Sequence, residues 1–129
     1  MNELNNTATA TGTYNSVPTS LTSNATVVNM IDGLTLVKSA DKKNWVDGNL
    51  TYTITINNQT ATSYETPVVK DILEDSLVEF VADSVTIDGV KADKSKYSYD
   101  EGTHTLTVNL ENVLPSSSSV LTFQVNKKA

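Results

Sequence analysis

The chain of 129 residues contains no cysteine and no arginine, and its one histidine is His104. The lack of cysteine excludes a disulfide framework and thiol chemistry. A single histidine is too few for a zinc site or catalytic triad built on histidines, so we expect no enzyme. All nine basic residues are lysines, which lack the bidentate fork that arginine offers to phosphates and guanines. Because the net charge is also -6, we expect no binding of nucleic acid.

Long apolar runs are also missing, and none approaches the length of a membrane-spanning helix. The first six residues lack the basic and apolar regions of a signal peptide, which fits an excised fragment as well as a cytosolic protein. The acidic residues do not reproduce the alternate spacing of a calcium loop. We therefore expect no membrane insertion within this segment, no metal and no cofactor.

Threonine, serine and asparagine are abundant instead, with 19, 13 and 13 residues, and this excess favours strands and turns over helices. The clearest pattern lies in residues 50–56, where large apolar side chains alternate with threonines. Alternation with a period of two predicts a half-buried antiparallel strand. The turn signal Asp47-Gly48 precedes it, and residues 34–38 predict a shorter strand before that turn.

Further short strands follow, and residues 105–110 and 120–125 alternate as cleanly as the first. No stretch has the helical period. About seven short strands separated by turn signals predict an all-β fold, an antiparallel β-sandwich with Greek-key connectivity. The side chains expected in its core are Leu36, Tyr52, Ile54, Ile56, Leu106, Val108, Leu121, Phe123 and Val125.

The first 31 residues are more polar than the rest and are dominated by threonine, asparagine and serine. Residues 7–13 predict an exposed strand, residues 16–24 are interpreted as a linker, and residues 25–31 predict another strand. We therefore expect a polar strand and linker over residues 1–31 and one sandwich domain over residues 32–129.

Several motifs stand in a specific order along residues 34–126. A lysine strand, Leu-Val-Lys-Ser-Ala-Asp, is followed by a turn glycine and the tyrosine strand Leu-Thr-Tyr-Thr-Ile-Thr-Ile-Asn-Asn. An aspartate-leucine motif around Asp71 and a last loop and strand beginning at Leu114 come after them. In this order they resemble the conserved repeat of bacterial cell-surface proteins known as domain of unknown function eleven. The chain departs from the family's pattern at Glu74, where many members have proline.

This resemblance implies an immunoglobulin-like sandwich that is repeated in tandem along wall-anchored or secreted proteins of Gram-positive bacteria. In that family the repeat acts mostly as a stalk or spacer. The location implied is extracellular, at the bacterial cell surface, and the partners implied are neighbouring repeats of the same protein. The first 31 residues would then be the end of a preceding repeat.

Lys38 and Asp71 are the candidate site residues. Lys38 shares the parity of Leu36, and Asp71 shares that of Leu73, so both side chains would turn inward. Related surface-protein sandwiches join a buried lysine to an asparagine through an intramolecular isopeptide bond, helped by a nearby acidic residue. Burial would leave the amine neutral and nucleophilic and would let the carboxyl protonate and polarise the amide. The alternative is a lysine that snorkels at a strand end and an aspartate that caps a turn.

The asparagine partner stays open. Asn126 is near the last strand, but its parity is opposite to that of Val125, so a bulge would be needed to turn it inward. Family repeats usually end with a strand of Ile-Thr-Asn-Thr-Ala type, and residues 4–11 look like that strand. We hypothesise that the chain is one period of a tandem array, cut out of phase, whose sandwich lacks its closing strand.

Residues 4–11 would then stay disordered, fold back into the gap of their own domain, or exchange with another copy. We favour pairing over disorder, because an edge strand without its partner is a template for strand addition. In the paired cases Asn6 would approach Lys38.

Two functions remain as hypotheses. The first is a structural repeat, and the second is an adhesin module that recognises a host protein or glycan. A structural repeat should expose no apolar patch of a few hundred Å². The outward positions of three strands are mostly threonine, which favours the first hypothesis. Trp45 is either a binding aromatic or a lid over the end of the sandwich.

Overall fold

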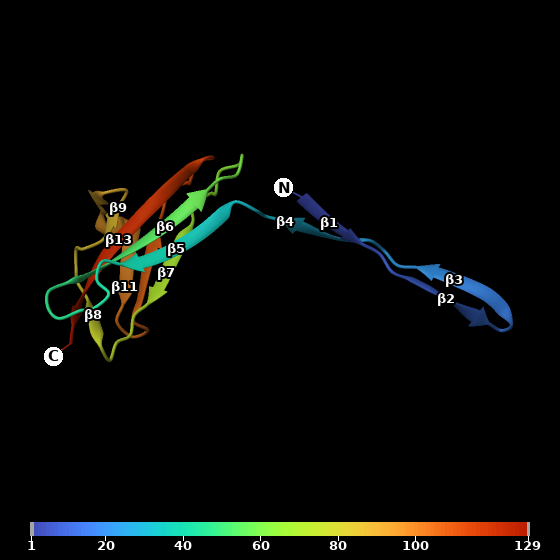
Figure 1. Cartoon of the computed structure of the whole chain (residues 1–129), viewed down its shortest axis with the longest axis horizontal. Coiled ribbons are helices and arrows are strands. Elements are labelled where there is room, and N and C mark those ends of the chain that lie inside the picture. The colour runs from blue at the N-terminus through green and yellow to red at the C-terminus, as the bar shows by residue number, and fades with distance from the viewer. Residues whose placement is uncertain (1, 129) are drawn as a thin grey trace. The chain divides into compact units, whose positions relative to one another are not determined.

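The computed structural model describes residues 2–128 (Figure 1). The chain divides into two compact units between Asp32 and Gly33. The described residues form antiparallel strands and a single short 3-10 turn, Lys94–Lys96, and they contain no α-helix. The predicted all-β class is therefore confirmed. Within residues 2–128 there is no helix of the length and apolar character that a membrane span requires.

The first unit holds four strands: β1 (Asn2–Asn6), β2 (Thr9–Tyr14), β3 (Val17–Thr22) and β4 (Thr26–Met30). The second unit begins with β5 (Leu34–Ala40), β6 (Leu50–Asn58), β7 (Val68–Ile72) and β8 (Val78–Phe80). It continues with β9 (Thr86–Ile87), β10 (Val90–Lys91), β11 (Tyr97–Asp100), β12 (Thr105–Asn109) and β13 (Ser117–Lys127).

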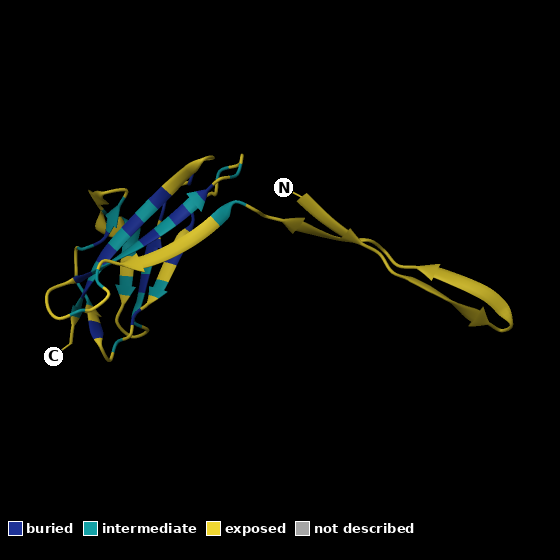
Figure 2. Cartoon of the chain, viewed as in Figure 1, coloured by how far each residue is buried: buried dark blue, intermediate teal, exposed yellow. Residues whose placement is uncertain are grey.

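The first unit is a two-stranded ribbon in which β1 pairs with β4 and β2 pairs with β3. Its tip is the two-residue turn Asn15-Ser16, whose φ angles of 49° and 63° lie in the left-handed region that such hairpin turns require. Most of residues 16–24 therefore belong to strand β3, which corrects their interpretation as a linker. Asparagine tolerates the left-handed conformation, so the chain reverses at this point instead of running on. All residues from 2 to 32 are exposed (Figure 2).

A bulge keeps most of the large apolar side chains of this ribbon on one face, although Val27, opposite Asn5, lies on the other. Residues 7–8 separate β1 from β2, whereas residues 23–25 separate β3 from β4, so the returning strand has one extra residue. The extra residue switches the parity of the returning strand, and without it β3 and β4 would present their apolar residues to opposite faces. The side chains gathered on this face are Leu4, Ala10, Tyr14, Val17, Leu21, Val28 and Met30.

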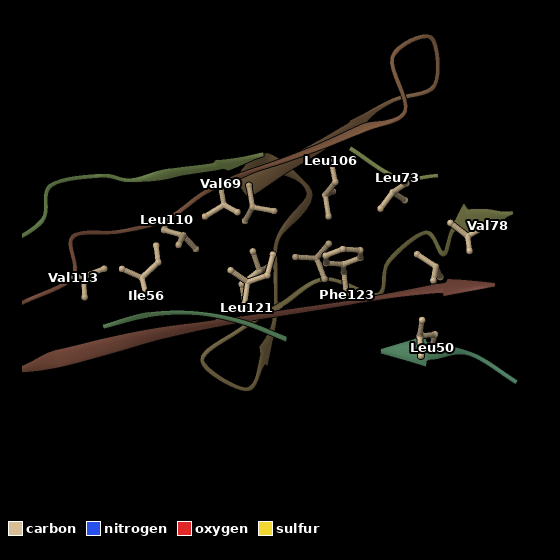
Figure 3. Close-up of a cluster of buried hydrophobic side chains, with 14 residues drawn as sticks. Leu50, Ile56, Val69, Leu73, Val78, Leu106, Leu110, Val113, Leu121 and Phe123 are labelled. Carbon is tan, nitrogen blue, oxygen red and sulfur yellow. The ribbon is translucent and has the colours of Figure 1, made fainter. Parts of the chain in front are cut away.

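The second unit consists of two antiparallel sheets. The larger has the strand order β10-β9-β13-β6-β5, with β8 also paired to β13, and the smaller has the order β11-β12-β7. Strand β13 is the longest and pairs with β6 from Ser117 to Val125. The inner faces of the two sheets meet in one apolar core (Figure 3). The two sheets have the arrangement of a β-sandwich, while the immunoglobulin-like Greek-key connectivity stays a prediction.

The core is largely the one that strand alternation predicts. Of the nine expected core residues, the seven buried ones are Ile54, Ile56, Leu106, Val108, Leu121, Phe123 and Val125. Tyr52 is partly buried against them, with its ring centroid 5.4 Å from that of Phe123. Val85, which comes from outside the strands, is also fully buried.

Leu36 is the exception, because its side chain is 65% exposed. It pairs with Ile56 in the β5–β6 ladder, so it lies on the inner face as its parity predicts. However, β5 is the last strand of the larger sheet and β7 is the last strand of the smaller one. Among residues 2–128 no strand pairs with the outer edge of β5. The prediction of a buried Leu36 is wrong, because parity determines the face of a residue and not whether the opposite sheet covers it.

We predict that Ile54→Ala lowers the free energy of unfolding by about 2–5 kcal/mol, because the truncation leaves a cavity in the core. Val90→Ala serves as the control, since Val90 is exposed and its truncation should change stability by no more than about 0.5 kcal/mol. Urea unfolding measures both values. Equal stability of the two variants would mean that the inner face of β6 is assigned wrongly.

Candidate functional site

A cleft of about 540 Å³ opens between the two sheets, beside the edge strands β5 and β7. Residues of β5, β6 and β7, of the turn that follows β7, and of the end of β13 line its walls. Both candidate site residues, Lys38 and Asp71, are among them. The cleft exists because β5 and β7 are the ends of their sheets, which leaves this side of the core without a covering strand.

Lys38 and Asp71 form an ion pair across this cleft, with Nζ and Oδ2 2.6 Å apart. Lys38 pairs with Ile54 on the inner face of β5, while Asp71 stands between the buried Val69 and Leu73 at the edge of the other sheet. The pair therefore joins the edge strands of the two sheets. The lysine side chain is 42% exposed and the aspartate only 11%, so the burial of the pair is one-sided.

The Asp71 carboxylate is incompletely satisfied. Its Oδ2 atom is buried and lacks a hydrogen-bond partner of acceptable geometry among the described residues, even though the Lys38 amine lies within ion-pair distance. The contact is thus electrostatic without being well directed. A carboxylate oxygen accepts more than one donor. An additional N–H group entering the cleft would find an acceptor at Asp71.

Two aromatic rings, those of Tyr52 and Trp45, also line the cleft. The Lys38 amine lies 4.3 Å from the centre of the Tyr52 ring, in the position of a cation–π contact. Trp45 packs against the core and is held by a 3.0 Å hydrogen bond from its indole N–H to the Gly48 carbonyl. The Lys127 amine lies 5.8 Å from the centre of the indole ring. Trp45 thus occupies the place of a lid and also lines the cleft, so both of its predicted roles remain open.

A second charged group lines a neighbouring hollow, which shares Lys128 with the cleft. The Asp75 carboxylate accepts a 2.8 Å contact from the Lys128 amine and lies 3.2 Å from Nδ1 of His104. The hydrogen bond from Lys128 lowers the pKa of Asp75, and the same bond raises the pKa of Lys128. Because these groups are solvent-exposed, the pair adds little stability. Its effect is to tie the end of β13 to the turn after β7.

The candidate asparagines are placed differently. Asn126 pairs with Glu79 in the β13–β8 ladder, and that ladder continues through Val125 without a bulge. Its side chain therefore points away from the core face, and strand β6 lies between β13 and the strand of Lys38. The structure does not bring Asn126 to Lys38. Asn6 belongs to the first unit, where it pairs with Thr26.

The cleft has the groups for one kind of chemistry, the reaction of an amine with a carboxamide. An amine in its neutral form is a nucleophile, and a neighbouring carboxyl group can donate a proton to the amide and carry protons between the reacting groups. Lys38 and Asp71 supply these two groups at contact distance. The Lys38 side chain is 42% exposed, so a reaction shielded from water requires that the cleft be covered. Within residues 2–128 no cluster of three or more acidic or histidine side chains is arranged to hold a metal ion.

The sequence does not reveal the cleft, nor that Tyr52 and Lys127 line it. Tyr52 was recognised only as a core residue, because alternation does not reveal which inner-face residue stands beside an open edge. The charges of Lys127 and Lys128 carry no pattern of their own. Only the pairing of β13 with β8 brings them to the cleft.

We predict an asymmetric response to removal of each partner of the ion pair. Lys38→Met should lower the free energy of unfolding by about 1–3 kcal/mol, because it leaves a buried carboxylate unpaired. Asp71→Asn should cost less, because the half-exposed amine can be hydrated. The double variant should cost less than the sum of the two single ones. Urea unfolding gives the values, and Lys70→Met, at an exposed neighbouring position on β7, is the control. Additive effects would show that the two side chains do not interact.

Comparison with known proteins identifies no relative: no family model, no curated protein and no solved structure matches this chain.

Proposed function

We propose that this chain is a structural stalk or spacer repeat of a Gram-positive bacterial surface protein. The observation that carries the proposal is the Lys38–Asp71 pair, which joins the edge strands of the two sheets where the sandwich is open. A contact at this position resists separation of the sheets. It suits a domain that works by holding its shape rather than by turning over a substrate.

The order of motifs along residues 34–126 supports the assignment to a bacterial surface. These residues resemble the conserved repeat described above, and they cover nearly all of the second unit. The motif residues Lys38, Tyr52 and Asp71 come together around one cleft. The placement at an extracellular cell surface rests on this resemblance.

The proposal includes a covalent cross-link between Lys38 and the Asn6 side chain. The lysine nitrogen would form a new bond to the amide carbon, the bond from that carbon to the amide nitrogen would break, and the nitrogen would leave as ammonia. Asp71 would pass the proton from the attacking amine to the leaving group. Asn6 is favoured over Asn126 because the latter faces away from the core two strands from Lys38.

An adhesin module is the second candidate, and the cleft itself is the observation that favours it. Trp45 and Tyr52 line a concave surface that a glycan or an extended peptide could enter. The two functions differ in what Trp45→Ala should do. In a structural repeat this change lowers stability alone, whereas in an adhesin it also abolishes binding to a glycan or host-protein array by a protein that remains folded.

Intact-mass spectrometry of the full chain tests the covalent part of the proposal. We predict that a fraction of the protein is lighter than the sequence mass by one ammonia per cross-link. Lys38→Ala and Asp71→Ala should each restore the full mass, because they remove the nucleophile and the proton carrier. Lys70→Ala is the control and should keep the ammonia loss. Full mass for the wild-type chain at every protein concentration and after prolonged incubation would refute the cross-link.

A further inference from the structure

We infer that the cleft beside β5 takes strand β1 of a second copy of this chain, added in parallel to the outer edge of β5. The inference rests on the proposed function, and it names a second copy of the chain as the partner that covers the open edge of the sandwich. It concerns non-covalent strand addition and therefore stands whether or not the isopeptide bond forms.

The acceptor is an edge strand with an uncovered inner face. The outer edge of β5 has no pairing strand among the described residues, so its backbone N–H and C=O groups are available for a further ladder. On the inner face of β5, Leu36 remains 65% exposed although it stands beside the buried Ile56. An added strand would cover Leu36, the cleft and the Lys38–Asp71 pair together.

The donor is a ribbon without a core. Isolated two-stranded hairpins are marginally stable in water, because one apolar face without cover does not offset the cost of ordering the chain. In the first unit that face carries Leu4, Val28 and Met30, all about half exposed or more. Strand β1 pairs only with β4, so its other edge is open. The bulge in the returning strand keeps the apolar face continuous, as a surface that packs against a partner requires.

The spacing of side chains selects a parallel register. In β1, Leu4 and Asn6 are two residues apart on one face, and in β5 Leu36 and Lys38 have the same spacing and order. A parallel strand therefore sets Leu4 beside Leu36 and Asn6 beside Lys38. An antiparallel strand with Leu4 beside Leu36 would instead set Asn6 against Leu34, where its amide is desolvated without a charged partner, so only the parallel register brings Asn6 to Lys38.

In the parallel register the Asn6 amide enters the cleft at Lys38 and Asp71. Its N–H₂ group is a donor of the kind that the buried Oδ2 atom of Asp71 lacks. The added strand also covers the half-exposed Lys38 amine. Strand addition thus gives the Asp71 carboxylate a hydrogen-bond donor and shields the Lys38 amine from water.

The connection between the units leaves no slack for β1 to pair with β5 of its own chain. In a sheet ordered β5-β1-β4, the chain must cross two strand spacings, about 10 Å, between the end of β4 and the start of β5. Gly33 is already held in line with β5, because its carbonyl accepts a 2.8 Å hydrogen bond from the Gln59 N–H. Only Ile31 and Asp32 then span the gap, and three Cα–Cα steps reach at most about 10–11 Å. A second copy meets no such limit.

Folding β4 directly beside its own β5 is the other intramolecular arrangement. A tight turn at Asp32-Gly33 would pair Val27 with Lys38 and Asn29 with Leu36. This pairing turns the more polar face of the ribbon toward the core and leaves the apolar face of Leu4 in water. The pattern of side chains therefore favours β1 of a second copy over β4 of the same chain.

Cysteine trapping tests the inference. The chain has no cysteine of its own, so only the introduced cysteines can form disulfides. In the proposed register Glu3 stands beside Thr35 on the outer face, so Glu3→Cys and Thr35→Cys leave Leu4 and Leu36 intact. Neighbouring strands lie about 4.8 Å apart, within the Cα–Cα range of a disulfide. The two single variants are mixed, oxidised and analysed by non-reducing electrophoresis and mass spectrometry.

We expect the mixed Glu3→Cys and Thr35→Cys proteins to form a heterodimeric disulfide at least about tenfold faster than the control mixture of Glu3→Cys with Ser39→Cys, which lies on the same face of β5 but four residues out of register. Leu4→Asp introduced into the Glu3→Cys protein should slow this cross-link at least about tenfold, because it places a charge on the apolar face. Asn5→Asp, on the polar face, is the matched control and should leave the rate unchanged.

Equal rates for the two mixtures would overturn the inference. A second outcome would also overturn the second copy as partner. In it, a Glu3→Cys/Thr35→Cys double variant forms its disulfide within one chain at high dilution, while the mixed single variants form none. This would show that β1 pairs with β5 of its own chain. Failure of strand addition leaves the stability predicted for the Lys38–Asp71 pair untouched. Failure of the proposed function would instead appear as glycan or host-protein binding that depends on Trp45.

Discussion

A β-sandwich needs cover on the inner face of every strand, and the strand β5 does not have it. The two sheets meet fully over β6, β13 and β12, where the core side chains are almost completely buried. At β5 and β7 the sheets end, and between them Leu36 is exposed. The Lys38–Asp71 ion pair is the contact that joins the two edges at this place. The open side determines the position of the cleft, the exposure of the amine and the unsatisfied oxygen of Asp71.

Each of the two units lacks a feature that the other has. The sandwich has a core but an uncovered edge, whereas the ribbon has an apolar face but no core. The apolar face of the ribbon is not random, because a bulge in the returning strand keeps most of its large apolar residues on a single face. The matching spacing of leucine and polar residue in β1 and β5 gives these two surfaces a common register. The proposed structural role and the proposed strand addition therefore rest on the same features.

Much of this fold could be predicted from local patterns. Alternation located β6, β12 and β13, and parity indicated that Lys38 and Asp71 face inward, because both depend only on neighbours along the strand. The exposure of Leu36 could not be predicted, since it depends on where the opposite sheet ends. The same holds for Asn58, a buried amide that donates 2.8 and 2.9 Å hydrogen bonds to the carbonyls of Thr62 and Val113. Val113 is far away in the sequence, and only the tertiary fold reveals this partner.

The central claim is that the outer edge of β5 is open in the single chain and is covered by strand addition. Amide hydrogen exchange of residues 34–40, followed over a range of protein concentrations, tests it most directly. The account predicts fast exchange of the outward N–H groups of β5 in dilute protein and increasing protection as the concentration rises. The amides of β6, which lie inside the sheet, should stay protected throughout. Exchange in β5 that is independent of protein concentration would contradict the account.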